Sequence, residues 1–436
     1  MKKNILNFVL IVWCAVVQAQ QIPTPAPVQS KTILILNATA HIGDGTVIEN
    51  SAISLVNGKI DLVADARVIR LDMTKFDTII DAAGMHAYPG FIAPNTTLGL
   101  QEIEQVRPTR DYQEVGTYKP GMRTAINYNT DSEIIPTVRY NGVLMSQPTP
   151  RGGTISGTSC IVQHDAWNWE DALIKADDGV HLNWPQVFHK HYDKGKVAVE
   201  KIKSYDQQKR EIFAFFDESK AYATLKNPAV AELRYEAMKG LFDGSKTLFV
   251  HADDIKALTE VIAFKRAYQL KHVVIVGGLD APLVAKDLVD EGIAVMVARV
   301  HSLPRFEEDA IDQPFTLAKQ LYDAGVLFCL ENSGDQEHHG VRNLPFYAGT
   351  CVAYGLPYEQ AVAAISGNTA KILRVDSTCG TLAAGKDATL FLSRGDALDM
   401  RTNGLVMAFI QGRQIELTSK QTELYEKFKK KYEQGK

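Results

Sequence analysis

Short apolar runs separated by turn signals occupy two stretches of the chain, residues 31–85 and residues 376–418. In the first stretch an apolar run leads into Asn57-Gly58, and this dipeptide is typical of a tight β-hairpin. The second stretch shows the same short runs with glycine turns of its own. Both stretches are therefore predicted to be all-β.

Residues 86–375 follow a different pattern, in which apolar strand candidates alternate with amphipathic helical segments. Apolar strands between such helices are typical of a parallel sheet covered by helices. Eight strand-and-helix units close a (β/α)₈ barrel of about 250 residues or more. The pattern thus predicts an α/β fold with a TIM-like barrel. The strand candidates are residues 86–92, 142–145, 160–163, 180–182 (the weakest), 247–250, 272–276, 293–298 and 326–330.

Residues 1–19 have the pattern of a secretory signal peptide: two lysines, an apolar run over residues 5–17 and the small residue Ala19 at the cleavage position. The run is too short to span a bilayer, which takes about 20 residues, so no stable membrane insertion is expected. Residues 20–30 carry three prolines and are predicted to be an extended linker. We expect an exported protein, periplasmic or secreted, from a bacterium.

The C-terminal residues 419–436 are predicted to form a helical tail. One face of this helix is apolar and lysines surround it, so a solvated helix docked on the body of the protein is favoured over a helix that lies on a membrane surface. The apolar positions are Leu424, Tyr425, Phe428 and Tyr432.

Charge and cysteine content exclude two classes of protein. The 436 residues carry 47 Lys and Arg against 51 Asp and Glu, and this balance has no basic excess for nucleic acid. The five cysteines are too few and too widely spaced for a disulfide scaffold, and the sequence leaves open whether Cys329 and Cys351 pair.

Three motifs resemble the amidohydrolase superfamily, in particular its imidazolonepropionase-like members and related secreted bacterial proteins. They are Tyr88-Pro89-Gly90-Phe91-Ile92, Val250-His251-Ala252 and Gly385-Lys386-Asp387-Ala388-Thr389-Leu390. The resemblance implies a barrel over residues 86–375 and a small β-sandwich built jointly from residues 31–85 and 376–418. It also implies hydrolysis of carbon–nitrogen bonds in amides or cyclic amides by a bound divalent metal, zinc or another, that activates water.

The residues that would hold this metal are mostly replaced. The family has a His-x-His pair on the first strand, where this chain has Asn95 and Thr97. The aspartate of the eighth strand falls near Ser333, and no lysine or glutamate of the fourth strand is evident between residues 178 and 246. Only His251 on the fifth strand matches. Amides and hydroxyls are poor zinc ligands, so the metal site is predicted to be degenerate.

Two arrangements of the remaining residues stay open. Alternation along a strand puts Glu331 on the same face as Ser333, so a rearranged metal site of His251, Glu331 and either His338 or His339 is one hypothesis. The other is that residues 335–339 form a solvated loop and that His251 is a hydrogen-bonded histidine of the barrel.

Two classes of function follow from the resemblance and from the replaced metal ligands. The first is a C–N hydrolase with an altered site, acting on a small molecule. The second is a catalytically inactive relative, a pseudoenzyme, that binds a small molecule or serves as a partner subunit, in a homo-oligomer or in a hetero-oligomer with an intact relative. Fold alone does not decide between them.

Overall fold

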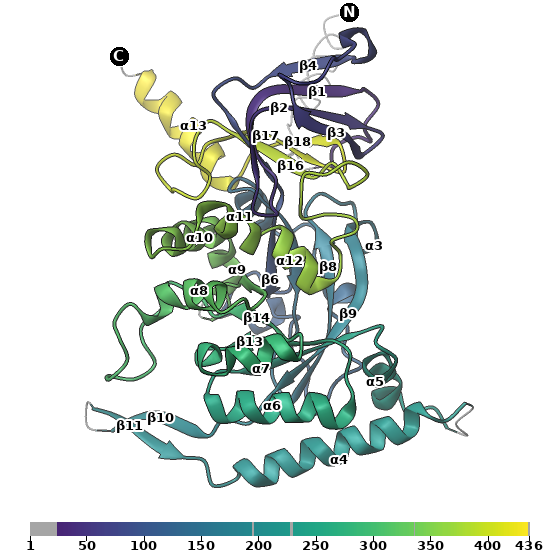
Figure 1. The fold of residues 1–436 in the computed structure, drawn as a ribbon, viewed down its shortest axis with the longest axis vertical. Helices are drawn as coiled ribbons and strands as arrows, with labels where there is room; N and C mark the ends of the chain where they lie inside the picture. The colour runs from purple at the N-terminus through teal and green to yellow at the C-terminus, as the bar shows by residue number, and fades with distance from the viewer. Residues whose placement is uncertain (1–23, 194–195, 227–229, 335, 435–436) are drawn as a thin grey trace, which may run out of the picture.

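The computed structural model describes residues 24–193, 196–226, 230–334 and 336–434 (Figure 1). The predicted signal peptide and the first residues of the predicted linker, 20–23, lie outside the described residues. Two sheets of eight strands each organise the chain, and a separate two-stranded hairpin accompanies them.

The first sheet combines both ends of the chain, as predicted, and lies at one end of the molecule (Figure 1). Its strands run in the order β18-β17-β16-β5-β1-β2-β3, with β4 paired to β1, so it is one hydrogen-bonded sheet. The N- and C-terminal parts meet where β16 pairs antiparallel with β5. The strands are β1 (Ile33–His41), β2 (Val47–Val56), β3 (Lys59–Asp65), β4 (Thr78–Asp81), β5 (His86–Pro89), β16 (Leu390–Ser393), β17 (Leu405–Ile410) and β18 (Arg413–Ile415).

The Asn57-Gly58 hairpin is confirmed. Val56 pairs with Lys59 across the turn, and both turn residues have positive φ, 49° and 80°. Asparagine and glycine tolerate these left-handed conformations, which match the twist of the flanking strands.

The second sheet is the predicted barrel, with strand order β15-β14-β13-β12-β9-β8-β7-β6. Between its two end strands lies the segment that joins α11 to α12, where the Ile92 N–H donates to the Ile365 carbonyl at 2.9 Å. The strands are β6 (Phe91–Thr96), β7 (Val143–Pro148), β8 (Ile155–Gln163), β9 (Leu173–Asn183), β12 (Thr247–Ala252), β13 (Val273–Gly277), β14 (Ala294–Val297) and β15 (Phe328–Leu330).

The barrel differs from the predicted parallel sheet at β8, which runs antiparallel to both β7 and β9. Only residues 149–154 separate β7 from β8. A parallel crossover takes a dozen or more residues, whereas a short connection returns the chain in the opposite direction. All other neighbouring strands of the barrel pair in parallel.

The first strand candidate, residues 86–92, is divided between the two sheets at Gly90. Residues before it form β5 of the first sheet, and residues after it begin β6 of the barrel. A Cβ atom at Gly90 would lie 2.8 Å from Cγ2 of Thr389 and 3.0 Å from Cδ1 of Leu144. The chain therefore passes from one sheet to the other at a point where only glycine fits.

Helices cover the outside of the barrel (Figure 1). The hairpin β10–β11 precedes α4 along the chain, and its second strand, β11, ends before α4 begins. The α-helices are α2 (Ile135–Arg139), α3 (Trp169–Ala172), α4 (Tyr205–Ala223), α5 (Leu233–Asp243), α6 (Ile255–Tyr268), α7 (Ala285–Asp290), α8 (Gln313–Asp323), α9 (Glu337–Gly340), α10 (Leu344–Ala353), α11 (Tyr358–Ala364), α12 (Gly367–Leu373) and α13 (Lys420–Glu433), and the hairpin strands are β10 (Phe188–Asp193) and β11 (Lys196–Lys201).

The C-terminal helix α13 begins with a capping box formed by Ser419 and Thr422. Its apolar face is not packed against the body, since all four aromatic and aliphatic side chains of that face are exposed. In the part of the chain that the structure describes, no helix has the length and apolar character needed to cross a membrane. The described cysteines, at positions 160, 329, 351 and 379, are buried and free, so Cys329 and Cys351 do not pair.

Candidate functional site

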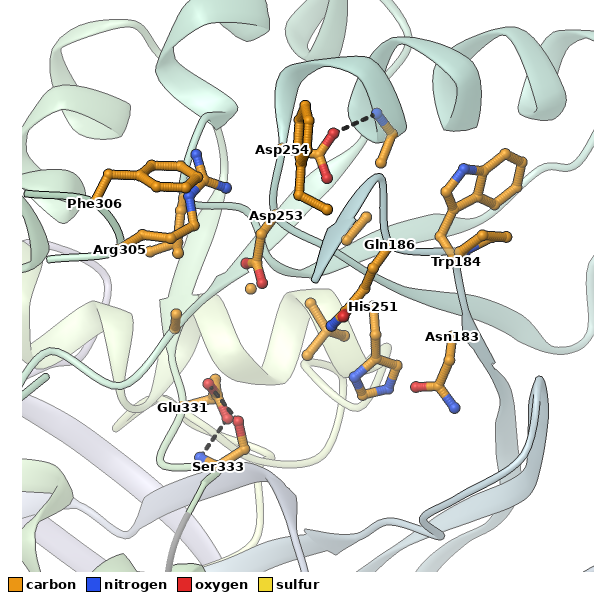
Figure 2. A pocket seen from close by; sticks show the side chains of 18 residues that line it. Asn183, Trp184, Gln186, His251, Asp253, Asp254, Arg305, Phe306, Glu331 and Ser333 are labelled. Carbon is orange, nitrogen blue, oxygen red and sulfur yellow. Dashed lines mark hydrogen bonds between the residues drawn. The ribbon is translucent and has the colours of Figure 1, made fainter. Parts of the chain in front are cut away.

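A cavity of about 750 Å³ opens where the parallel strands of the barrel end (Figure 2). His251 enters it from β12, and Glu331 and Ser333 enter it from the residues that follow β15. A second cavity of about 430 Å³ shares His251 and Ser333 and extends to Asn95 and Thr97. Loops at the C-terminal ends of barrel strands are free to vary without disturbing the core, so this is the place where the fold carries function.

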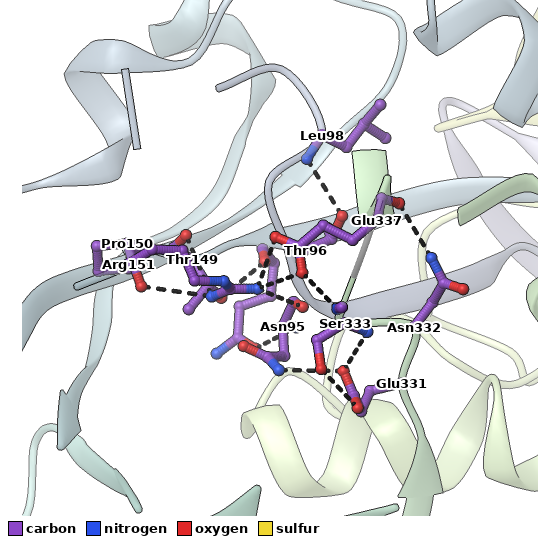
Figure 3. A network of polar contacts seen from close by, with 12 residues as sticks. Asn95, Thr96, Leu98, Thr149, Pro150, Arg151, Glu331, Asn332, Ser333 and Glu337 are labelled. Carbon is purple, nitrogen blue, oxygen red and sulfur yellow. Dashed lines mark hydrogen bonds and ion pairs between the residues drawn. The ribbon is translucent and has the colours of Figure 1, made fainter. Parts of the chain in front are cut away.

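Glu331 is buried at 1 % exposure and is held by three hydrogen bonds (Figure 3). The backbone N–H of Ser333 donates to Oε2 at 2.6 Å, the Ser333 hydroxyl donates to Oε1 at 2.8 Å, and Nδ2 of Asn95 donates to Oε2 at 3.1 Å. Burial raises the pKa of Glu331 to about 7, and the bonds from Ser333 oppose this only in part. A carboxyl group of this kind exchanges a proton readily near neutral pH.

The side chains of Asn95 and Thr97 are both buried, and that of Asn95 contacts the Glu331 carboxylate. Asn95 has φ 48°, a left-handed conformation that asparagine adopts more easily than most residues, and the pairing of β6 with β7 is irregular there. Neither Oδ1 of Asn95 nor Oγ1 of Thr97 has a hydrogen-bond partner. Buried polar atoms without partners are rare and costly, so these two atoms are available to a bound molecule.

His251 contacts a second histidine that the sequence analysis did not assign to the site. Its Nε2 lies 3.0 Å from Nδ1 of His181 on β9, the fourth strand of the barrel. Burial lowers the pKa of His251 to about 3 and that of His181 well below its usual value, so both rings are neutral at pH 7. His181 lies between residues 178 and 246, where no lysine or glutamate ligand is evident. Its position in the apolar alternation Gly179-Val180-His181-Leu182 was the signal that it points into the barrel.

His338 and His339 do not join this site, because neither lines the two cavities. Both lie on α9, where their rings are tilted by 40° with centroids 4.2 Å apart, and His338 is buried. The structure therefore brings together Asn95, Ser333, Glu331 and, across the cavity, His251. The first residue of the predicted loop, Asp335, lies outside the described residues.

The residues of the site do not fit the metal centre that the resemblance implies. Among the described residues, no group of three or more His, Cys, Asp or Glu side chains is placed to share a metal ion. His251 directs Nε2 to another imidazole, and Glu331 accepts hydrogen bonds from Asn95 and Ser333. Amide and hydroxyl groups stand where zinc prefers imidazole and carboxylate.

Comparison with solved structures identifies the fold. An amidohydrolase from Thermotoga maritima superposes with a TM-score of 0.73 over 88% of this chain and 99% of that chain, at 20% sequence identity. A Xaa-Pro dipeptidase with bound methionine matches over 88% of this chain and all of the other with a TM-score of 0.53 and 13% identity. The chain has the amidohydrolase fold. A molinate hydrolase has a TM-score of 0.51 at 15% identity, over 89% of this chain and 95% of that one. No protein-family model and no curated protein matches the sequence.

The amidohydrolase fold thus confirms the predicted resemblance at the level of architecture. One of the similar structures, an adenosine deaminase from Xanthomonas campestris, contains zinc; it has a TM-score of 0.50 and 13% identity, over 90% of this chain and 93% of that one. Likeness at these identities concerns the fold, and the chemistry has to be argued from the site itself.

Arg151 stabilises the loop that closes the site on the side of Asn95 (Figure 3). Its guanidinium donates to the Asn95 carbonyl at 2.9 Å and to Oε2 of Glu337 at 3.1 Å. Glu337 also accepts from the Gly334 N–H at 3.1 Å. Arg151 therefore ties β6 to the loop after β15 and places Asn95 beside Glu331.

The opposite wall of the cavity carries a second set of charges (Figure 2). Desolvation by the surrounding protein raises the pKa of Asp253 above its usual value. Arg305 pairs with Asp280 at 2.7 Å and stacks on the ring of Phe306. Asp254 is occupied as the N-cap of α6, where it accepts from the Ala257 N–H at 3.2 Å. The cavity thus combines neutral histidine, carboxyl groups and an aromatic surface, a lining suited to a small polar organic molecule.

Proposed function

We propose that this protein is a hydrolase of small amides or cyclic amides that cleaves their carbon–nitrogen bond with Glu331 as general base and without a zinc centre of the usual family kind. The observation that carries the proposal is the buried carboxyl of Glu331, held at the end of β15 by Ser333 and Asn95 and facing a cavity of about 750 Å³. Hydrogen bonds on both of its oxygens keep this group in one orientation.

The pKa of Glu331, raised to about 7 by burial, suits both halves of the reaction. The ionised carboxyl takes a proton from a water molecule as the water oxygen bonds to the amide carbon. The protonated carboxyl then gives that proton to the leaving nitrogen as the carbon–nitrogen bond breaks. A group whose pKa lies near the working pH is efficient in each direction.

Two buried acceptors support an amide as the substrate. Oδ1 of Asn95 has no partner, although Nδ2 of the same side chain is bound to Glu331, and Oγ1 of Thr97 is also without one. An N–H or O–H donor of the substrate would satisfy Asn95 and hold the substrate beside the carboxyl of Glu331. The fold-level likeness to an amidohydrolase, a dipeptidase and a deaminase is in keeping with such a substrate, as an analogy only.

The test is a turnover screen of the purified protein with cyclic amides and dipeptides, run with and without a chelator. We expect product formation that the chelator leaves unchanged and that Glu331→Gln reduces at least a hundredfold, since general acid–base catalysis contributes about 10²–10⁴. Glu170→Gln, a change of the same type on an exposed helix residue, is the control and should keep full activity. Activity that survives in Glu331→Gln would refute the role of this carboxyl.

A second candidate function is that of a catalytically inactive amidohydrolase relative, which binds its ligand without converting it. It would act alone or as the partner subunit of a relative with an intact site. The replacement of both first-strand histidines by Asn95 and Thr97, and the serine at position 333, favour it. Saturable binding of a cyclic amide without product, in a calorimetric titration, would support this reading over the hydrolase. Pull-downs from periplasm, where we propose that the protein resides, would then look for the partner.

Metal content separates both candidates from a conventional amidohydrolase. We expect the purified protein to retain far less than one zinc per chain after soaking and desalting. The triple variant Asn95→His, Thr97→His and Ser333→Asp should gain zinc, because it adds two imidazoles and a carboxylate beside His251. Stoichiometric zinc in the unaltered protein, lost on His251→Ala, would show that the site had been misread.

A further inference from the structure

A continuous line of buried side chains runs from Asp178 to the cavity. The Ser159 hydroxyl donates to Oδ1 of Asp178 at 2.5 Å, and Nε2 of His181 lies 2.9 Å from that hydroxyl oxygen. Nδ1 of His181 lies 3.0 Å from Nε2 of His251, whose ring borders both cavities. The line crosses three neighbouring strands, β8, β9 and β12, and its first three members are at most 1 % exposed.

The direction of these hydrogen bonds is set at the far end of the line by Gln147. The Asn95 backbone N–H donates to Oε1 of Gln147 at 3.0 Å, so that oxygen is identified as the acceptor end of the amide. Nε2 of Gln147 consequently donates to Oδ2 of Asp178 at 2.9 Å. Both carboxylate oxygens of Asp178 therefore face donors. Burial raises the pKa of Asp178, and these two hydrogen bonds, with the charges of Lys175 and Lys246, oppose that rise and favour the ionised form.

The protons of the two histidines follow from this arrangement. Ser159 has one hydroxyl hydrogen and gives it to Asp178, so the Nε2 of His181 has to supply the hydrogen of the next bond. A neutral imidazole has a single N–H, which makes Nδ1 of His181 an acceptor and Nε2 of His251 its donor. Nδ1 of His251 is then left with a lone pair, and it has no partner among the described residues.

We propose that Asp178, Ser159 and His181 are positioning residues that lock His251 in its Nε2–H tautomer, so that the site selects ligands that offer an N–H donor to Nδ1. The selection of ligands rests on the proposed function, whereas the tautomer is a property of the free protein. The single N–H of a secondary or cyclic amide can donate to Nδ1 of His251, whereas the N-alkylated form has no hydrogen to give. Oδ1 of Asn95 is a second acceptor, open to another donor of the ligand.

The tautomer is read directly from protein labelled with ¹⁵N-histidine, by long-range proton–nitrogen NMR. We expect His181 and His251 to show a protonated Nε2 and an unprotonated Nδ1, with their signals assigned by the loss of each in His181→Gln or His251→Gln. A protonated Nδ1 on His251 in the unaltered protein would overturn the proposal, and the variants serve only to assign the signals.

Asp178→Asn provides a sharper test, because it should reverse the line. Gln147 still donates to the Oδ2 position, so the new amide places its oxygen there and its NH₂ group toward Ser159. Ser159 then donates to His181, and the His251 tautomer should change to Nδ1–H. Asp61→Asn is the matched control, since Asp61 accepts from a buried strand serine, Ser54, in the first sheet. An unchanged His251 tautomer in Asp178→Asn would overturn the relay.

The ligand arm compares 2-pyrrolidinone with N-methyl-2-pyrrolidinone by NMR titration. We expect the unaltered protein to bind the N–H compound about tenfold more tightly, the effect of one hydrogen bond of about 1.4 kcal/mol, and the preference to disappear in Asp178→Asn. Equal affinities in the unaltered protein would overturn the selectivity. If neither compound is hydrolysed while the tautomer is as expected, the hydrolase proposal fails and the relay stands.

Discussion

Glu331→Gln should make the protein more stable at neutral pH, by an amount that the burial of this carboxyl determines. An ordinary glutamate has a pKa of 4.5, and burial raises that of Glu331 to about 7. At 1.36 kcal/mol per unit, the shift corresponds to a cost of about 3 kcal/mol for ionising the folded state. Glutamine keeps the shape and an acceptor for the Ser333 N–H but carries no charge.

The sign follows from proton binding. Between about pH 4.5 and pH 7 the folded state holds the Glu331 proton and the unfolded state has released it, so the free energy of unfolding falls as the pH rises. Below this window both states are protonated, and above it both are ionised, so the contribution levels off. Glu331→Gln has no such titration. Its free energy of unfolding relative to that of the unaltered protein should therefore rise by up to about 3 kcal/mol from pH 4.5 to pH 8.

Urea unfolding followed by tryptophan fluorescence measures this difference. The described tryptophans, Trp167, Trp169 and Trp184, lie in the segments that flank β9, so the signal reports the barrel. The advantage of Glu331→Gln over the unaltered protein should be small at pH 4.5 and largest at pH 8, while Glu170→Gln should differ from the unaltered protein by the same amount throughout. An advantage for Glu331→Gln that does not change with pH would refute the reasoning, because Glu331 would then ionise as freely when folded as when unfolded.

Two further predictions concern the joint between the barrel and the first sheet. Asp165→Asn should lower the free energy of unfolding by about 3–5 kcal/mol, measured by urea titration. The carboxylate of Asp165 pairs with two largely buried guanidinium groups, Arg139 at 2.9 Å and Arg413 at 2.8 Å, and the variant leaves both without their counter-charge. A loss below about 1 kcal/mol would contradict this prediction. Gly367→Ala should lower the midpoint of thermal unfolding by several degrees, because the new Cβ would lie 2.0 Å from the backbone oxygen of Gly43. Gly121→Ala is the control: its Cβ would lie 3.9 Å from the nearest atom, so the midpoint should stay nearly unchanged. Equal midpoints for the two glycine variants would show that the backbone yields at residue 367.

Several features of the fold were predictable because they depend on neighbouring residues. The Asn57-Gly58 turn needs only the left-handed preference of its two residues. The alternation of apolar strands and amphipathic helices sufficed for the barrel, since each element must bury its own apolar face. The motif around Gly90 indicated the entry to the barrel, although not that two sheets meet at this residue.

Direction and pairing of the strands were decided by tertiary structure. The apolar pattern of β8 is the same whether the strand runs parallel or antiparallel, and only the short connection from β7 decides its direction. The role of His181 is not evident from the fourth strand alone, because it comes from a contact with His251, 70 positions further along the chain.

The site itself shows the same division. The resemblance implies that Asn95, Thr97 and Ser333 occupy positions where family members have metal ligands, and strand alternation puts Glu331 on the same face as Ser333. The bond from Asn95 to Glu331, 236 positions apart, forms only because the barrel places the end of β6 near the residues that follow β15. Residue type determines what each group can do, but burial sets the pKa of Glu331 and a neighbour's hydrogen bond sets the tautomer of His251, and both are properties of the folded chain.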